Sequence, residues 1–452
     1  MPLRNTNVKT FLRKYNRFLL TQSPQRNLVY GFFMYNLIGF LLLCLPFARK
    51  SDLSIIDALF ASTSAISTTG LLTLSMSDDF TFFGQLVIML LFQIGGIGYM
   101  TFTTYILLNT SRRASQWRER ILSAAFSIPD TLKLRPFLKS VIIYTVLFEI
   151  IGTIFFFIGF ADEDWGFWER LWNSLFHSVS AFCTAGFSLF NSGFTDYVSD
   201  GWINFTISFL AIAGSLGFIV FTDFWLKLTK KGHRVSFTSK LIMSGFLILL
   251  TAGTTTLYFA EPEIISLDGA PRFYAAFFQS MSAMTTVGFN TIDFGGFILP
   301  TAMVTILLMY IGASPSGTSG GLKITTFVAT VAYLRSKLKN SVEVMFFNRQ
   351  IPDERVSVAV STFIFYFMLS FAGIFLLTFS ETISLEMISF EVLSALGTVG
   401  LSMGITGSLT MFGKIVIICL MFIGRLGVLT FGLAISKTYI DNGHVIEEDI
   451  AV

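Results

Sequence analysis

Four short stretches of this sequence share one pattern, and that pattern decides the fold. They read FASTSAISTTG (Phe60–Gly70), FHSVSAFCTAG (Phe176–Gly186), FQSMSAMTTVG (Phe278–Gly288) and FEVLSALGTVG (Phe390–Gly400). The common pattern is F-x3-S-A-x2-T-x-G, in which five positions agree in all four copies. The glycine recurs after 116, 102 and 112 residues, so the chain is a fourfold repeat of one structural unit.

The composition places these repeats in a membrane. Of the 452 residues only 13% are charged, whereas a soluble protein carries about 25%. Apolar runs long enough to span a bilayer are expected near 29–47, 80–109, 140–160, 202–227, 240–259, 298–333, 357–380 and 411–436. They form four pairs, and each pair encloses one shared stretch. We therefore expect an all-α membrane protein with eight transmembrane helices and four re-entrant pore helices around one pore.

The repeat and the distribution of positive charge predict how the chain is organised. The expected units are an N-terminal tail (1–28), four repeats of first span, pore helix and second span (29–110, 137–228, 239–338 and 356–437) and a C-terminal tail (438–452). Lys and Arg gather in the N-terminal tail and in the links between repeats, whereas acids such as Glu261 lie on the other side. The positive-inside rule then predicts a multi-pass protein of the cell membrane with both termini in the cytoplasm.

The T-x-G ends of the four stretches are the expected ion-binding element. Polar backbone at membrane depth must be buried in protein or line water. Four copies around one axis can turn their carbonyl oxygens toward a common centre and replace the water shell of a cation, and the C-terminal end of each short helix adds partial negative charge there. The expected filter residues are Thr68, Thr69, Gly70, Thr184, Ala185, Gly186, Thr286, Val287, Gly288, Thr398, Val399 and Gly400.

The second spans carry a repeat of their own. The motifs GGIG (95–98), GSLG (214–217) and GRLG (424–427) correspond, and we interpret their glycines as sites of close helix packing. The third copy, GGLK (320–323), comes about eight residues late, so 312–319 is an insertion within a membrane helix. Only this third repeat is therefore expected to be broken.

The insertion predicts a gate. Proline and glycine disfavour a helix here, and a helix broken at membrane depth is tolerated where it lines a cavity. We expect a flexible loop on the cytoplasmic side of the filter that obstructs ion passage. Arg425 lies in an apolar run at the position equivalent to Gly321, and we expect it to hydrogen-bond loop carbonyls. The expected gate residues are Gly312, Ala313, Ser314, Pro315, Ser316, Gly317, Thr318, Ser319, Gly320, Gly321, Lys323 and Arg425.

Other positions in the short helices receive structural interpretations. The shared Phe, Ser and Ala are expected to pack each helix against its neighbours. His177 is expected to be structural, while Asp57 and Asn173, thirteen residues before their glycines, either cap the helices or pack at the outer mouth. The sequence contains no visible metal-ligand cluster or nucleophile–base pair, so we expect no enzymatic activity.

Across nearly its whole length the chain resembles the Trk/Ktr/HKT superfamily of potassium and sodium transporters. The resemblance rests on the T-x-G segments. Two of them, Thr286–Gly288 and Thr398–Gly400, are similar to the opening of the potassium-channel filter signature. Eight spans with a short N-terminal tail resemble the KtrB-type membrane subunit. The resemblance implies one pore per chain, a gating loop in the third repeat and potassium as the transported ion, because glycine rather than serine stands at Gly70.

The resemblance also implies partners. KtrB-type subunits form homodimers in bacterial membranes and sit on a cytosolic ring of nucleotide-binding RCK subunits of the KtrA type. The chain itself has no nucleotide-binding motif. Its basic links are expected to orient the protein and, as an alternative to binding a cytosolic partner, to contact anionic membrane lipid. We expect no nucleic-acid partner. The family often depends on sodium, although no sodium site can be located. A sodium-selective or HKT-like pore, a rocking secondary transporter and a membrane scaffold stay open as alternatives.

Overall fold

The computed structural model describes residues 24–98, 134–229, 234–312 and 314–436, and every structural statement below concerns these residues. Most of the expected N-terminal tail, the end of the span predicted near 80–109, Ala313 of the expected gate and nearly all of the predicted repeat link 111–136 lie outside them. The expected C-terminal tail (438–452) also lies outside.

Four long helices begin the four repeats: α2 (Pro24–Leu43), α8 (Leu134–Gly159), α11 (Phe237–Ala260) and α16 (Asp353–Ser380). Each exposes large apolar side chains, such as Phe33, Ile150, Ile248 and Phe371, which are 51–68% exposed. Exposed apolar surface of this extent suits contact with lipid rather than water.

Four short helices follow the long ones: α3 (Ile55–Ile66), α9 (Phe167–Phe182), α13 (Ala270–Thr285) and α17 (Leu385–Gly397). At 1.5 Å per residue they measure roughly 18–24 Å, less than the roughly 30 Å of a hydrocarbon core. Their C-terminal halves are buried, and the shared residues Phe60, Phe176, Phe278 and Phe390 are each 0% exposed. They therefore end inside the protein rather than at a membrane surface.

The second helices of the repeats are α5 (Phe82–Ile97), α10 (Gly201–Thr229), α14 (Leu299–Tyr310) continued by α15 (Ile324–Leu338), and α18 (Met411–Leu426) continued by α19 (Val428–Ile435). Among the described residues, five helices are long and apolar enough to cross a membrane: α2, α8, α10, α11 and α16. The α18–α19 pair gives a sixth span if its 99° bend is allowed, and α5 and α14 are shorter apolar helices.

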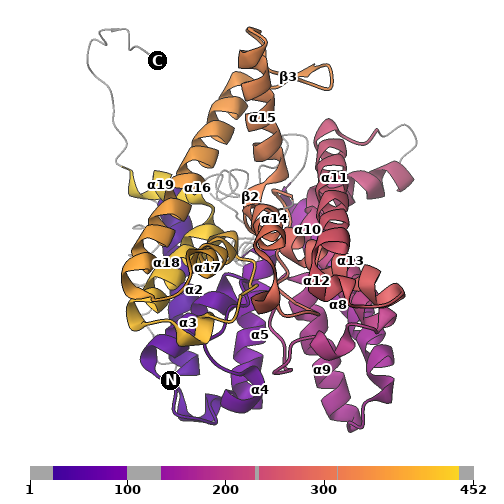
Figure 1. The fold of residues 1–452 in the computed structure, drawn as a ribbon, viewed down its shortest axis with the longest axis vertical. Helices are drawn as coiled ribbons and strands as arrows, with labels where there is room; N and C mark the ends of the chain where they lie inside the picture. The colour runs from indigo at the N-terminus through magenta and orange to yellow at the C-terminus, as the bar shows by residue number, and fades with distance from the viewer. Residues whose placement is uncertain (1–23, 99–133, 230–233, 313, 437–452) are drawn as a thin grey trace, which may run out of the picture.

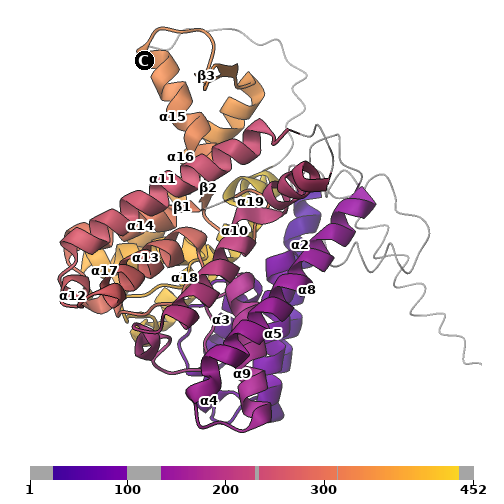
Figure 2. The ribbon, with the colours of Figure 1, turned by 90° about the vertical axis from the view of Figure 1, so that its right-hand side faces the viewer.

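Short elements complete the connections. They are η1 (Pro46–Ala48), α4 (Met76–Asp79), η2 (Phe160–Asp162), η3 (Thr195–Tyr197), α12 (Pro262–Ile265), η4 (Phe294–Gly296) and η5 (Thr406–Ser408). Strands β3 (Met345–Phe346) and β4 (Arg349–Gln350) form an antiparallel hairpin between α15 and α16. Figures 1 and 2 show α15, α16 and this hairpin standing out beyond the other helices at one end.

The repeats pack as a closed cycle. Each short helix contacts the second helix of the repeat before it: α9 packs on α5, α13 on α10, α17 on α14, and α3 on α18. The last of these pairs joins the fourth repeat to the first, and Figure 1 shows α18 close to α2 and α3. The short helices are consequently held around one centre.

Candidate ion pathway and gate

The four T-x-G segments meet at this centre. A Cβ atom added to Gly70 would lie 2.6 Å from the carbonyl oxygen of Ala185, and one added to Gly186 would lie 2.6 Å from that of Val287. The same construction at Gly288 reaches the carbonyl oxygen of Val399 at 2.2 Å, and at Gly400 it reaches that of Thr69 at 2.0 Å. Each glycine thus touches the next repeat, and the contacts close into a ring.

The backbone of the ring requires glycine for two reasons. The four glycines have φ between +69° and +93°, where a side chain is strained. In addition, a Cβ would press against the neighbouring carbonyl, which would have to shift to admit it. The threonines two residues earlier also adopt left-handed φ values of +49° to +57°, which the sequence analysis did not predict. A left-handed threonine costs about 1 kcal/mol or more, so the surrounding contacts must hold it in place.

The shared serine supplies part of that support. Its carbonyl oxygen accepts from the N–H of the middle residue of T-x-G in every repeat, at 2.8–3.2 Å. Its hydroxyl accepts from the glycine N–H in repeats one and four (Ser64 to Gly70 and Ser394 to Gly400, both 3.1 Å). In repeats two and three the hydroxyl donates to the carbonyl of Phe187 or Phe289. The serine therefore binds its own T-x-G segment and does not simply pack the helix against neighbours, as the sequence had suggested.

The carbonyl oxygens of the middle residues are left for another partner. In the described part of the chain, no hydrogen bond reaches the carbonyl oxygens of Thr69, Ala185, Val287 or Val399. Leaving a buried carbonyl unpaired costs about 1–3 kcal/mol. Four such oxygens in one ring, next to the C-terminal ends of four helices, form a site that a cation would satisfy.

Cavities open on both sides of the ring. At the glycine end lies a cavity of about 620 Å³, lined by all four filter glycines and by the segments that follow them. At the threonine end lies a second cavity of about 280 Å³, lined by residues 95–98, Phe218 and residues 424–427 of the second helices and by Pro315 and residues 319–321 between α14 and α15. The ring therefore lies between two cavities.

The expectation that only the third repeat is broken is wrong. Gly98 ends α5 with φ +85°, Gly217 interrupts α10 with φ +81°, and Gly427 separates α18 from α19 with φ +84°. All three are the last glycine of the GGIG, GSLG and GRLG motifs. The first glycine of each motif does pack closely, because a Cβ there would lie 2.0–2.1 Å from the carbonyl of Ile66, Phe182 or Leu396.

The third repeat differs because its break is longer. Residues Gly312–Gly321, here called the repeat-three loop, separate α14 from α15, and the pairing of β1 (Ile311–Gly312) with β2 (Leu322–Lys323) closes it. The loop is buried rather than loose: Ser314, Ser316 and Thr318 are 0–2% exposed.

The loop sits in the break of α10. The N–H groups of Ser314 and Thr318 donate to the carbonyls of Ser215 (3.2 Å) and Gly214 (3.0 Å). In return, the N–H of Phe218 donates to the carbonyl of Ser316 at 3.3 Å. The non-helical glycine at 217 frees these groups from the helix ladder, so the break in repeat two provides the seat for the insertion in repeat three.

The loop also touches the filter threonines. The hydroxyl of Thr184 donates to the hydroxyl of Thr318 at 3.2 Å, and the N–H of Gly320 donates to the hydroxyl of Thr286 at 3.0 Å. The hydroxyls of Thr68 and Thr398 are buried and have no hydrogen-bond partner among the described residues. Gly320 also lies directly against the hydroxyl of Thr398, because an added Cβ there would clash with it. The loop therefore lies against three of the four filter threonines.

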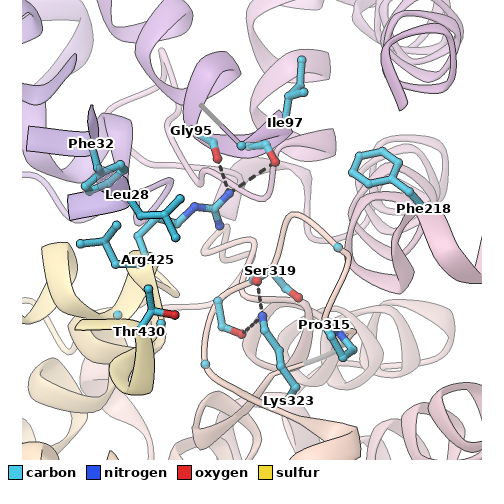
Figure 3. Close-up of a pocket in the computed structure, with 18 residues that line it drawn as sticks. Leu28, Phe32, Gly95, Ile97, Phe218, Pro315, Ser319, Lys323, Arg425 and Thr430 are labelled. Atoms are coloured by element: carbon cyan, nitrogen blue, oxygen red, sulfur yellow. Dashed lines mark hydrogen bonds between the residues drawn. The ribbon is translucent and has the colours of Figure 1, made fainter. Parts of the chain in front are cut away.

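Two cationic side chains line the cavity beneath the loop (Figure 3). Arg425 donates to the carbonyl of Thr318, which is the expected loop contact, and also to the carbonyls of Gly95 and Gly96. Lys323 donates to the carbonyls of Ser319 and Gly320, the latter at 2.8 Å. Within the described ranges neither cation has a carboxylate partner, so both leave positive potential in the cavity.

The outer mouth contains an ion pair that the sequence analysis missed. The Asp57 carboxylate accepts from the ammonium of Lys414 at 2.7 Å and from the hydroxyl of Thr73 at 2.8 Å. It therefore joins α3 of repeat one to α18 of repeat four. Asn173, at the equivalent position, donates to the carbonyl of Glu169 within its own helix. No charge pattern in the sequence points to the pair of Asp57 and Lys414, because 357 residues separate the two partners. The only signal was the position that Asp57 shares with Asn173.

Comparison with known proteins identifies the class of protein to which this chain belongs. The family model for TrkH, described as a cation transport protein, matches residues 7–442. The chain belongs to this family of multi-pass membrane transporters, which are not enzymes.

Curated relatives and a solved structure agree with that family. The chain is 36% identical over 420 residues to "Ktr system potassium uptake protein B" of Bacillus subtilis (strain 168), covering 92% of this chain and 94% of the relative. It is 34% identical over 417 residues to "Potassium/sodium uptake protein NtpJ" of Enterococcus hirae, covering 90% and 92%. The crystal structure of the potassium transporter TrkH from Vibrio parahaemolyticus has the same fold, with a TM-score of 0.73, 18% identity and coverage of 92% and 86%.

Proposed function

We propose that this protein is the potassium-translocating membrane subunit of a Ktr-type uptake system. Potassium would pass through the ring of T-x-G carbonyls, from the 620 Å³ cavity at the glycine end to the cavity at the threonine end. The observation that carries the proposal is the closed ring of four T-x-G segments, whose middle carbonyl oxygens no hydrogen bond reaches in the described part of the chain. Flow would be driven by the membrane potential, at about 2.3 kcal/mol per charge per 100 mV.

The repeat-three loop and Arg425 would act together as the gate. The loop binds Thr184 and Thr286 at the threonine end of the ring, which is where an ion would leave the filter. Arg425 holds the loop by the carbonyl of Thr318 and adds a positive charge to the exit cavity, as does Lys323. Opening would require the loop to leave the break in α10 and Arg425 to release Thr318.

Sodium transport is the second candidate, because one relative is named as a potassium/sodium uptake protein. Glycine rather than serine at position 70 favours potassium. A rocking transporter is less well supported, even though the second helices of repeats two, three and four are broken and that of repeat one ends at the equivalent glycine, Gly98. These positions are equivalent in repeats arranged around one ring, and do not form one pair of discontinuous helices at the interface of two halves.

The partners and the orientation complete the proposal. A homodimer on a cytosolic ring of nucleotide-binding KtrA-type subunits would supply regulation, in keeping with the Ktr system to which a relative belongs. The loop side of the ring, together with the termini, would face the cytoplasm of a bacterial cell, in keeping with the positive charge of the links between repeats.

Uptake of ⁸⁶Rb⁺ and ²²Na⁺ into proteoliposomes, with wild type compared with Gly70→Ser, tests the transport proposal. We expect rubidium uptake by wild type with little sodium uptake, and a shift toward sodium in the variant. Rubidium uptake no greater than in empty vesicles, with or without the cytosolic ring, would refute transport. Free passage of sodium through wild type would refute the assignment of potassium.

A further inference from the structure

One buried position recurs behind the filter and holds a different residue in each repeat. It directly follows the shared Phe and stands nine residues before the filter glycine. The residues there are Ala61, His177, Gln279 and Glu391, which are 0–1% exposed. The sequence pattern did not mark this position, because no residue type is common to the four copies.

In repeat two the side chain binds the segment that follows the filter. His177 donates from Nδ1 to the carbonyl of Asn173 at 2.8 Å, which leaves Nε2 as an acceptor. That nitrogen accepts from the N–H of Leu189 at 3.2 Å and lies 3.2 Å from the hydroxyl of Ser188. Both residues come two to three positions after Gly186. His177 is therefore buried as expected, but its role is to hold the chain at the outer end of the filter.

In repeats three and four the side chain at this position also binds the segment that follows the filter, but through an amide and a carboxylate instead of an imidazole. With its amide oriented to satisfy both groups, Gln279 accepts from the N–H of Thr291 at 3.0 Å and of Ile292 at 2.7 Å. Glu391 accepts from the hydroxyl of Ser402 at 2.7 Å and from that of Thr406. The partners again lie just beyond the filter glycine, two to six residues on.

Repeat one replaces the missing side chain by one from the preceding helical turn. Ala61 has no polar atom, but Asp57, four residues earlier, accepts from the hydroxyl of Thr73 at 2.8 Å. Thr73 is the third residue after Gly70. All four repeats thus have one acceptor on the short helix that fixes the chain immediately outside the ring.

We propose that Asp57, His177, Gln279 and Glu391 are positioning residues that fix the outer end of the filter and thereby set its preference among alkali cations. The inference rests on the proposed function, because it requires that ions pass the ring. Thr73, Ser188, Ser402 and Thr406 line the outer cavity next to the filter glycines, so their position determines how the outermost carbonyls are spaced. A buried polar residue that only satisfies its own hydrogen bonds would not need to reach the same short segment in every repeat.

The test compares Gln279→Met with Gln279→Glu. Methionine has a similar length but cannot accept both N–H groups, whereas a carboxylate can. We expect the ratio of ²²Na⁺ to ⁸⁶Rb⁺ uptake to rise about twofold to tenfold in Gln279→Met, the effect of one neutral hydrogen bond on an equilibrium. The ratio should return toward the wild-type value in Gln279→Glu.

Ser370→Ala is the matched control, because Ser370 is buried in α16 and, among the described residues, bonds only to its own helix, at the carbonyl of Tyr366. Its ratio should equal that of wild type. Thr73→Val removes the hydroxyl bound by Asp57 from a half-buried residue, so it provides a second reading if Gln279→Met does not fold. It should raise the ratio as well.

An unchanged ratio in folded Gln279→Met, or in Thr73→Val where Gln279→Met is unfolded, would overturn the inference, as would an equal rise in Ser370→Ala. Those results leave rubidium uptake by wild type intact. Absence of rubidium uptake by wild type would instead refute the proposed function, so the two failures are distinguishable.

Discussion

Replacing Gly217 by alanine should open the gate without touching the filter. Gly217 forms the break in α10, with φ +81° and ψ 165°, and the repeat-three loop lies directly against it. An added Cβ would lie 2.5 Å from the N atom of Gly317 and 2.7 Å from the carbonyl carbon of Ser316. Because both atoms are backbone, the loop must shift to relieve the contact.

The expected gain in uptake follows from the free-energy cost of the substitution that is present only in the closed state of the gate. Overpacking of a well-packed site costs about 1–3 kcal/mol, and the loop escapes this cost when it leaves its seat. A difference of that size shifts an equilibrium about 5-fold to 150-fold. The positive-φ backbone at position 217 adds about 1–3 kcal/mol of strain, but it does so in both states.

Gly427→Ala is the control for backbone strain. Gly427 makes the equivalent break between α18 and α19 with φ +84°, yet the nearest atom to an added Cβ is the hydroxyl of Thr430 at 3.8 Å. The assay is initial ⁸⁶Rb⁺ uptake by proteoliposomes without a cytosolic partner, normalised to folded protein. Gly217→Ala should exceed wild type and Gly427→Ala should not. Unchanged or reduced uptake in folded Gly217→Ala, or an equal gain in both variants, would refute the role of the loop.

Two further pairs of substitutions probe the gate and the filter. Arg425→Leu removes the charge-assisted hydrogen bond to Thr318, worth about 1.5–3 kcal/mol, and should raise rubidium uptake about tenfold or more. Arg425→Lys keeps the charge and should give a smaller gain, and uptake below wild type in both variants would contradict the gate. Ser394→Ala leaves the buried N–H of Gly400 without a partner, whereas Ser180→Ala frees only a carbonyl with a second lone pair. Loss of rubidium-over-sodium preference should therefore be greater in Ser394→Ala, and equal losses would count against this account of the serine.

The parts of the site that could be predicted from sequence are those that repeat identically. The four glycines stand out because a positive φ and a close neighbouring carbonyl disfavour other residues there, and all four copies keep glycine. Pro315 and its neighbouring glycines likewise predict a broken helix, because proline and glycine disfavour helical backbone. Arg425 was recognisable because a charge in an apolar run needs a polar partner.

The parts that were missed depend on tertiary contact. Gly98, Gly217 and Gly427 lie in continuous apolar runs, and glycine packing and a helix break look the same in such a run. His177, Gln279 and Glu391 share a task but no residue type, so only the structure reveals that each reaches the chain beyond the filter.

The central claim is that the ring of main-chain oxygens binds the transported ion. Anomalous diffraction from crystals grown with rubidium tests it most directly, because the signal locates the ion without a prior assumption. We expect anomalous density on the axis of the ring, within contact of the carbonyl oxygens of Thr69, Ala185, Val287 and Val399. Density confined to other places, with the ring holding no ion at saturating rubidium, would contradict it.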